Sequence, residues 1–174
     1  MRVDRDALRL SKADIEIATL LADTCEVTAA AAAAKDQAFT VSLPDTTLRV
    51  QGDPVRLTQA VGNLLHNAVK YTPTHGHIRM TVFPEGRNLV IKINDNGSGI
   101  SPVLLPHIFE LFAQSSRAIT ASAGGLGIGL AVVKAIARSH GGTVSAASTG
   151  PGGGSEFMLK LPIVTSSHAF YGSI

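Results

Sequence analysis

The sequence predicts an α+β fold, a two-layer α/β sandwich in which three main helices cover one face of a mixed, mostly antiparallel sheet of about five strands. Segments in which every second residue is apolar, as in strands, are interspersed with segments in which apolar residues recur every three or four positions, as in helices. Two turn-forming stretches, residues 84–87 and 150–154, each separate two strand-like segments and therefore predict antiparallel hairpins. Helices that accompany such hairpins pack together on one side of the sheet.

The first predicted helix lies in the N-terminal third of the chain. Asp14 is expected to be its N-cap, with Glu16 in the first turn and apolar residues at helical spacing after them. The alanine run at residues 29–34 continues this helix, since alanine is the best helix former. The residues before the helix have a weak strand pattern around Leu8 and Leu10.

Two more helices are predicted by their caps. Asp53 followed by Pro54 is an N-cap with proline at the first helical position, and the helix that it opens runs to about Tyr71. A last helix is expected over residues 127–140, with the glycines at positions 141–142 as its C-terminal cap. The predicted strands are the remaining alternating segments: residues 39–43, 48–50, 77–83, 88–94 and 157–161, and a strand that begins at Val144.

Composition limits the classes of function. The net charge is +2 and the lysine and arginine residues are scattered, so no nucleic-acid partner is expected. The single cysteine, Cys25, excludes an internal disulfide or a zinc cluster, suits a reducing cytoplasm, and is expected to be a small core residue on a helix. No apolar run reaches the ~20 residues of a membrane span. We therefore expect a cytoplasmic, monomeric domain without direct membrane contact, although a longer parent protein could be anchored in the inner membrane.

The helix from Asp53 to Tyr71 has a polar face that could bind a metal and phosphate. Two asparagines lie four residues apart on this face, Asn63 and Asn67, and Lys70 follows one turn later. Amide oxygens suit a hard cation such as Mg²⁺, and a lysine nearby suits phosphate. Taken alone, the pattern is equally typical of an ordinary polar helix face. The opposite, apolar side consists of Leu57, Val61, Leu64, Leu65 and Ala68.

Two glycine-rich segments follow. Residues 95–100, Asp-Asn-Gly-Ser-Gly-Ile, come directly after a strand, and the carboxylate of Asp95 can accept a hydrogen bond from an exocyclic amino group. Residues 125–130, Gly-Leu-Gly-Ile-Gly-Leu, run into a helix whose first N–H groups can bind an anion. Each segment alone is also a common turn sequence. The second is neither a dinucleotide-binding fingerprint, because the spacing differs, nor a Walker A loop, because the chain has no Gly-Lys pair.

The order of these segments is more specific than any one of them. An Asn-x-x-x-Asn-Ala-x-Lys-Tyr helix, a hairpin, Asp-x-Gly-x-Gly and Gly-x-Gly-x-Gly-Leu follow one another, and this order resembles the ATPase domain of histidine kinases, gyrase-type topoisomerases, Hsp90-type chaperones and mismatch-repair ATPases. Residues 108–114, Ile-Phe-Glu-Leu-Phe-Ala-Gln, resemble the phenylalanine box of histidine kinases, and residues 140–144 and 154–157 also match the kinase pattern. The resemblance covers about residues 14–162 and implies the Bergerat ATP-binding fold, with ATP and Mg²⁺ as ligands.

The resemblance implies a role for each matching residue. Asn67 would bind Mg²⁺ with Asn63 in support, Lys70 would contact the phosphates, and Tyr71 would lie along the nucleotide. Asp95 would accept a hydrogen bond from the adenine amino group. The adenine pocket would be shaped or lined by Gly97, Gly99 and Ile100. The phosphates and the hinge of a lid over the nucleotide would involve Gly125, Leu126, Gly127, Ile128, Gly129 and Leu130.

The lid itself, at about residues 113–124, departs from the family in one place. Many members have an arginine two residues after the second phenylalanine of the box, Phe112, and this arginine reaches the γ-phosphate. Here Gln114 occupies that position, and Arg117 either replaces the arginine or is a solvent-exposed lid residue. Phe109 and Phe112 either anchor the lid and help to dock a histidine domain, or simply pack within it.

Position 63 separates kinases from the hydrolytic relatives. Those relatives have a glutamate there that activates water, and an asparagine cannot accept that proton. The resemblance therefore favours transfer of the γ-phosphate to a supplied nucleophile, which depends mainly on positioning and charge neutralisation. His66, which precedes Asn67, replaces an acidic residue that is common in the family, and either accepts a proton or is a hydrogen-bonding surface residue.

The phosphoacceptor histidine is expected outside this chain. In the family it is followed by Glu or Asp, and none of the six histidines has such a neighbour. We therefore expect residues 1–13 to be a linker from a missing dimerisation and phosphoacceptor domain, residues 14–162 the catalytic domain, and residues 163–174 a tail. The expected partners are that histidine-bearing domain and a response regulator receiver domain. Two alternatives stay open, a nucleotide-binding regulatory module and an anti-sigma-type serine kinase, and the phenylalanine box favours the histidine kinase over the latter.

Overall fold

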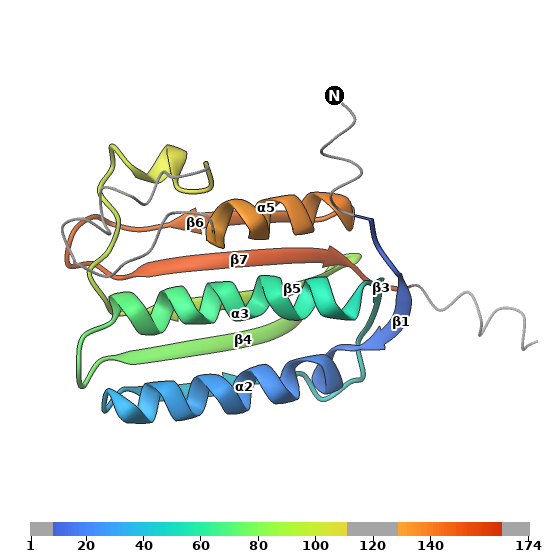
Figure 1. The fold of residues 1–174 in the computed structure, drawn as a ribbon, viewed down its shortest axis with the longest axis horizontal. Helices are drawn as coiled ribbons and strands as arrows, with labels where there is room; N and C mark the ends of the chain where they lie inside the picture. The colour runs from blue at the N-terminus through green and yellow to red at the C-terminus, as the bar shows by residue number, and fades with distance from the viewer. Residues whose placement is uncertain (1–8, 111–128, 165–174) are drawn as a thin grey trace, which may run out of the picture.

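A five-stranded sheet with helices on one face forms the fold in the computed structural model, which describes residues 9–110 and 129–164 (Figure 1). The strand order is β2-β4-β5-β7-β6, in which β2 and β4 are parallel and every other pair is antiparallel. The bounds are Ala38–Ser42 for β2, His77–Glu85 for β4, Asn88–Asp95 for β5, Thr143–Ala147 for β6 and Ser155–Pro162 for β7. The predicted mixed, mostly antiparallel sheet is therefore confirmed.

The helix layer contains three α-helices within the described residues. They are α2 at Ile17–Ala34, α3 at Pro54–Tyr71 and α5 at Gly129–Ser139, and a short 3-10 helix, η1, spans Leu105–His107. Figure 1 shows α2, α3 and α5 lying side by side, with α3 in the middle. The two-layer sandwich predicted from the sequence is thus present, and α3 lies over the centre of the sheet.

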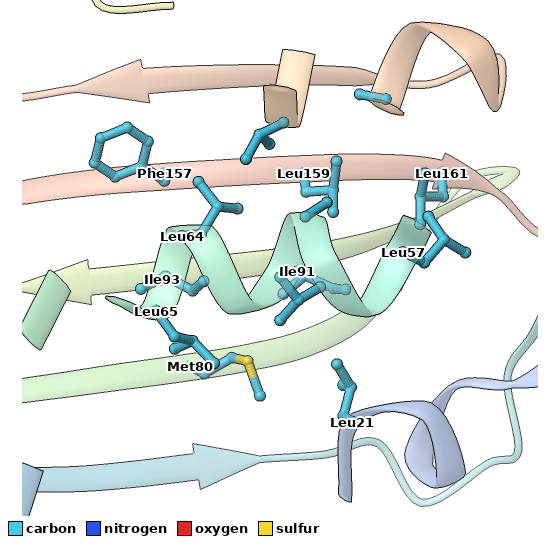
Figure 2. Packing of buried hydrophobic residues seen from close by; sticks show 14 of the residues in the cluster. Leu21, Leu57, Leu64, Leu65, Met80, Ile91, Ile93, Phe157, Leu159 and Leu161 are labelled. Carbon is cyan, nitrogen blue, oxygen red and sulfur yellow. The ribbon is translucent and has the colours of Figure 1, made fainter. Parts of the chain in front are cut away.

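The core lies between α3 and the sheet. All five residues of the predicted apolar stripe on α3 are buried, and Figure 2 shows Leu57, Leu64 and Leu65 among side chains of the strands. The strand residues alternate, so that Ile91 and Ile93 of β5 join this core while Lys92 between them lies on the other face. The stripe was predicted from helical spacing alone, and its burial fixes which face of α3 remains available for function.

The N-terminus of α3 is fastened at two points. The carboxylate of Asp53 accepts hydrogen bonds from the backbone N–H groups of Val55 and Arg56 at 3.0 and 3.1 Å, as an N-cap does, and from that of Ser11 at 2.9 Å. The backbone N–H of Asp53 donates to Nε2 of His140 at 3.0 Å, and Nδ1 of His140 lies 2.8 Å from the carbonyl of Ile136. His140 is buried, and it links the end of α5 to the start of α3.

The cap should make stability depend on pH in the acid range. The N–H groups of Ser11 and Arg56 hold the pKa of the Asp53 carboxyl below its usual range. A carboxyl whose pKa is lower in the folded state stabilises the fold above its unfolded pKa of about 3.9, and this contribution is lost as the pH falls through the folded value. Asn at this position still caps the helix but carries no charge. We expect the difference in unfolding free energy between wild type and Asp53→Asn to be constant above about pH 5 and to shrink below about pH 4.

Urea unfolding of both proteins at several pH values measures this difference. Asp45→Asn, a change at an exposed carboxylate in the turn after β2, is the matched control for the loss of one negative charge. If wild type exceeds Asp53→Asn in unfolding free energy by the same amount at pH 3 and at pH 7, the Asp53 carboxylate is not the source of the pH dependence.

The predicted helix start at Asp14 is wrong. Residues Ala13–Glu16 form a strand, β1, which pairs antiparallel with β3 at Arg49–Gly52. Nε of Arg49 donates to the Asp14 carboxylate at 3.0 Å across this pair, and α2 begins only at Ile17. Pairing with a distant strand thus overrides a local capping signal, and Ile15 is buried opposite Val50 in this pair.

Other boundaries differ by a few residues. Leu10 belongs to no strand, and Leu8 lies outside the described residues. The second short strand, β3, is in the two-stranded sheet with β1 and not in the main sheet. The start expected for the last helix, residues 127–128, also lies outside the described part, where α5 is first seen at Gly129.

Helix α2 is the most apolar of the described helices. By length and composition it is the one described helix that could cross a membrane, a test that core-facing helices of soluble proteins also pass. Its buried residues share one face, which includes Leu21 and Thr24, and its other face carries exposed Asp23 and Glu26. Cys25 is partly buried against the core as expected, and burial raises the pKa of its thiol.

Candidate functional site

Two segments that are distant in the sequence contact the C-terminal half of α3. Nδ2 of Asn63 donates a hydrogen bond to the carbonyl of Gly129, the first residue of α5, at 3.1 Å. The carbonyl of Tyr71, the last residue of α3, accepts from the backbone N–H of Ser98 at 3.0 Å, in the loop after β5. The polar face of α3 is therefore joined to the start of α5 on one side and to the loop with Asp95 on the other.

The predicted binding residues of α3 are partly covered by the fold. Asn63 and Lys70 are half-buried, while Asn67 has only 7% of its surface exposed. Within residues 9–110 and 129–164, the side-chain amide of Asn67 makes no hydrogen bond to the protein. Nζ of Lys70 lies 5.4 Å from the centroid of the Tyr71 ring.

These side chains suit a hard, oxygen-preferring cation such as Mg²⁺. Mg²⁺ takes hard oxygen ligands, keeps several waters and uses one or two protein ligands together with substrate phosphates. Asn67 provides an amide oxygen, and Asn63 already uses its Nδ2 on Gly129, which leaves its oxygen as an acceptor. Among the described residues there is no group of three or more His, Cys, Asp or Glu that could hold a metal by itself.

Asp95, the last residue of β5, has its carboxylate held by two donors. One oxygen accepts from the backbone N–H of Gly97 at 2.8 Å, and the other accepts from the hydroxyl of Ser155 at 2.9 Å. A carboxylate has about four lone-pair sites, so these two bonds fix its orientation and leave it able to accept from a further donor. Such a fixed acceptor can select a ligand by its amino group.

The glycines of the loop after β5 allow close packing of backbone against backbone. A Cβ on Gly97 would lie 2.3 Å from the carbonyl oxygen of Tyr71. Gly99 has φ of +74°, and a Cβ there would lie 2.1 Å from the carbonyl oxygen of Gly150. Both glycines are therefore required by the protein's own packing, between the end of α3 and the loop that joins β6 to β7. Ile100, which follows, is fully buried in the core.

Two serines that no sequence motif singles out support this loop. Ser155 orients Asp95, as described above, and the hydroxyl of Ser148 accepts from the N–H of Ile100 at 3.0 Å and donates to the carbonyl of Gly154 at 2.7 Å. Ser155 pairs with Asp95 in the register of β5 and β7, which no local pattern reveals. The only signal in the sequence is the match of residues 154–157 to the kinase pattern.

The remaining predicted residues divide into two groups. Phe109 is half-buried and packs edge to face on Phe157, with ring centroids 6.1 Å apart, so it joins the core. Gly129 is exposed at the first position of α5, and Leu130 is buried. The others lie outside the described residues: Phe112, Gln114, Arg117, Gly125, Leu126, Gly127 and Ile128. His66 is exposed, lines a groove between α2 and α3, and makes no hydrogen bond within the described part of the chain.

Known proteins resemble this chain in sequence. The family model of histidine kinase-, DNA gyrase B- and HSP90-like ATPases matches residues 52–165. The sensor protein KdpD of Clostridium acetobutylicum is 36% identical over 128 residues, which are 74% of this chain and 14% of that protein. The sensor-like histidine kinase SenX3 of Mycobacterium tuberculosis is 34% identical over 155 residues, which are 89% of this chain and 37% of that protein. The chain thus spans well under half the length of these curated relatives.

Solved structures resemble it as well. The crystal structure of full-length ShkA in complex with AMPPNP has a TM-score of 0.78 at 28% identity, and the match covers 92% of this chain and 33% of that one. The mycobacterial sensor histidine kinase MprB has a TM-score of 0.75 at 27% identity, over 88% of this chain and 98% of the MprB chain. The fold expected from the motif order is therefore found in experimentally determined kinase structures.

Proposed function

Because this chain belongs to the family of histidine kinase-, DNA gyrase B- and HSP90-like ATPases, as a histidine kinase catalytic domain, we propose that it binds Mg-ATP and donates the γ-phosphate to a histidine on a separate domain. One observation carries the proposal: the first residue of α5 and the loop that orients the Asp95 carboxylate both contact the C-terminal half of α3, which carries the polar residues. A relative of similar fold, ShkA, has been crystallised with AMPPNP, an ATP analogue, which supports ATP as the ligand.

Each group at this site suits one part of the nucleotide. Asp95 would accept a hydrogen bond from the adenine amino group and thereby favour ATP over GTP, whose guanine has an oxygen at that position. Lys70 would contact the phosphates, and Tyr71 would lie along the nucleotide. The N-terminus of a helix such as α5 carries partial positive charge, which suits phosphate oxygens.

Magnesium would be held by Asn67, with Asn63 in support. When bound, Mg²⁺ neutralises charge on the phosphate oxygens during transfer. The role of the protein is to hold the amide oxygen of Asn67 in place. Helix α3 does this by its buried apolar face, and the bond from Asn63 to Gly129 fixes the distance between α3 and α5.

The identity of residue 63 favours transfer over hydrolysis. An asparagine cannot take a proton from water, and its Nδ2 is engaged with a backbone carbonyl. The attacking group would be the imidazole of the supplied histidine, whose nitrogen forms a bond to the γ-phosphorus while the bond from that phosphorus to the bridging oxygen of ADP breaks. The imidazole N–H proton goes to solvent. In-line positioning and charge neutralisation are sufficient for such a step.

The proposed partners follow from this chemistry. They are the histidine-bearing dimerisation domain of the parent protein, from which residues 1–13 would lead, and the receiver domain of a response regulator. We place the catalytic domain, residues 14–162, in the cytoplasm, since the relatives are sensor kinases. His140 would not itself be the acceptor, because both of its ring nitrogens are engaged inside the fold.

Phosphotransfer to a histidine hairpin tests the proposal. The chain is incubated with γ-labelled ATP, Mg²⁺ and a matching histidine-bearing dimerisation hairpin. We expect label on the hairpin that is labile in acid and stable in base, as phosphohistidine is. Acid-stable label would support the serine kinase instead, and nucleotide binding without any transfer would leave a regulatory module.

Removal of the Ser155 hydroxyl should weaken nucleotide binding without unfolding the domain. In Ser155→Ala the Asp95 carboxylate keeps only the N–H of Gly97, so its orientation is no longer fixed on both sides. We expect the dissociation constant for Mg-ATP to rise about tenfold, which corresponds to about 1.4 kcal/mol, as measured by calorimetry. Ser145→Ala, a change on the exposed side of β6, is the matched control. Wild-type affinity in Ser155→Ala would contradict a role for this hydroxyl.

A further inference from the structure

The connection between α2 and β2 holds the C-terminal end of α3. Nζ of Lys35 donates to the carbonyl oxygens of Val69 and Thr72, at 2.7 and 3.0 Å. Nε2 of Gln37 donates to the same two oxygens, at 3.0 and 2.7 Å. Two side chains from another part of the chain therefore form hydrogen bonds with the end of α3. We call Lys35 and Gln37 the C-terminal clamp of α3.

The end of α3 needs such donors. The last four carbonyls of a helix have no partner within it, and Pro73, which follows this helix, has no N–H to offer. The C-terminal end of a helix also carries partial negative charge, which the ammonium group of Lys35 complements. Gln37 is only 7% exposed, and its side-chain oxygen, Oε1, has no hydrogen-bond partner within the described residues. An apolar side chain at position 37 would avoid the cost of that unpaired oxygen. The presence of glutamine is therefore explained by the two hydrogen bonds that its Nε2 donates.

The backbone extends the same contact. The N–H of His75 donates to the carbonyl of Asp36 at 3.0 Å, and the N–H of Ala38 donates to the carbonyl of Gly76 at 2.9 Å. The turn after α2 and the turn after α3 are thus tied together, and the parallel pair of β2 with β4 starts from this tie. The residues of the clamp therefore belong to a turn that backbone hydrogen bonds hold in place.

The clamp brackets the two residues proposed to bind the nucleotide. Lys70 and Tyr71 lie between the clamped carbonyls of Val69 and Thr72, and the carbonyl of Tyr71 is held by Ser98. Because Lys35 supplies the cation for the helix terminus, Lys70 is not needed to cap its own helix, and its Nζ lies near the Tyr71 ring. A lysine in the last turn of a helix without other donors tends to bond the last carbonyls.

We propose that Lys35 and Gln37 are positioning residues for nucleotide binding, which act through Lys70 by fixing the last turn of α3 and leaving the Lys70 ammonium for phosphate. This inference rests on the proposed function. It assigns to the turn after α2, which has no glycine-rich or asparagine motif, a part in binding the phosphates of ATP.

The test is a thermodynamic cycle on binding of Mg-AMPPNP, measured by calorimetry in the 174-residue chain. In Lys35→Met/Gln37→Met both carbonyls lose their side-chain donors, and we expect the dissociation constant to rise about tenfold. In the Lys70→Met background the same double change is expected to have an effect of less than twofold, because the clamp acts through Lys70. A purely structural role would lower the melting temperature and leave the affinity of the folded protein unchanged.

Two further variants define the chemistry. Lys35→Arg keeps the charge and the donors, and should bind Mg-AMPPNP within about twofold of wild type. Lys92→Met removes one positive charge from the other face of the sheet and should also bind as wild type does. If the double variant is unfolded at the assay temperature, Lys35→Met alone decides, because Gln37 still caps both carbonyls; we then expect a rise of about threefold.

The outcomes separate this inference from the proposed function. Wild-type affinity in the double variant, or in Lys35→Met where the double variant unfolds, overturns the inference. So does an equal loss of affinity with and without Lys70, because the clamp would then not act through that residue. Failure of the wild-type chain to bind Mg-AMPPNP would instead overturn the proposed function itself.

Discussion

Asp95→Ala is expected to raise the dissociation constant for Mg-ATP by at least about 100-fold while the domain stays folded. The change removes the acceptor for the adenine amino group, and an amino group buried without a partner costs about 1–3 kcal/mol. It also frees the N–H of Gly97 and the hydroxyl of Ser155, which both donate to this carboxylate, so the loop around the base loses its support. Calorimetry gives the affinity, and circular dichroism with thermal melting shows whether the fold survives.

Asp95→Asn separates the adenine contact from the support of the loop. The amide oxygen can still accept from Gly97, and the amide NH₂ then replaces the oxygen that accepts from Ser155 and, in our proposal, from the adenine amino group. An NH₂ group repels the adenine amino group and suits the guanine oxygen, so we expect the preference for ATP over GTP to fall at least about tenfold. Wild-type affinity for ATP in Asp95→Ala would show that the base does not bind at this carboxylate.

Asn67→Ala is expected to abolish the dependence of nucleotide binding on magnesium. If Asn67 is a ligand of Mg²⁺, its loss leaves the ion to the phosphates and to water, and phosphotransfer should fall by about 10²–10³, as when a group that stabilises transition-state charge is removed. The affinity for ATP is measured with excess Mg²⁺ and with a chelator. Wild type should bind more tightly with Mg²⁺, whereas the variant should bind equally under both conditions.

Asn94→Ala is the matched control for this change. Asn94 is an asparagine on β5 that donates to Glu156 on the open face of the sheet, away from the helices. It should behave as wild type in both conditions. Retention of the magnesium effect in Asn67→Ala would assign the metal to another residue.

Much of the fold could be predicted because its signals are local. The N-cap at Asp53, the proline after it and the apolar stripe of α3 act within one helix, and all are seen in the structure. The start of α2 was predicted wrongly because it depends on a contact between distant parts of the chain. Asp14 has the sequence context of a cap, yet it lies in a strand because residues 49–52, far along the chain, pair with it.

In the candidate site, too, local features could be predicted and contacts between distant residues could not. Asn63, Asn67, Lys70 and Asp95 stand out because their residue types and spacing suit a ligand, and the structure brings the segments that carry them together. Ser155 and the clamp of Lys35 and Gln37 were not anticipated as supports of the site, because each acts through a partner that is more than 30 residues away. Groups that position other groups depend on the sheet register and on how helices end, and neither is encoded in a short motif.

The central claim is that one nucleotide binds where α3, the loop after β5 and the start of α5 meet. Titration of the ¹⁵N-labelled chain with Mg-AMPPNP, followed by NMR, tests it directly. We expect shifts concentrated in the backbone N–H signals of residues 63–71, 95–100 and 129–131, and small changes at Arg79, Lys92 and Met158 on the open face of the sheet. Absence of binding, or shifts centred on the open face, would contradict the claim.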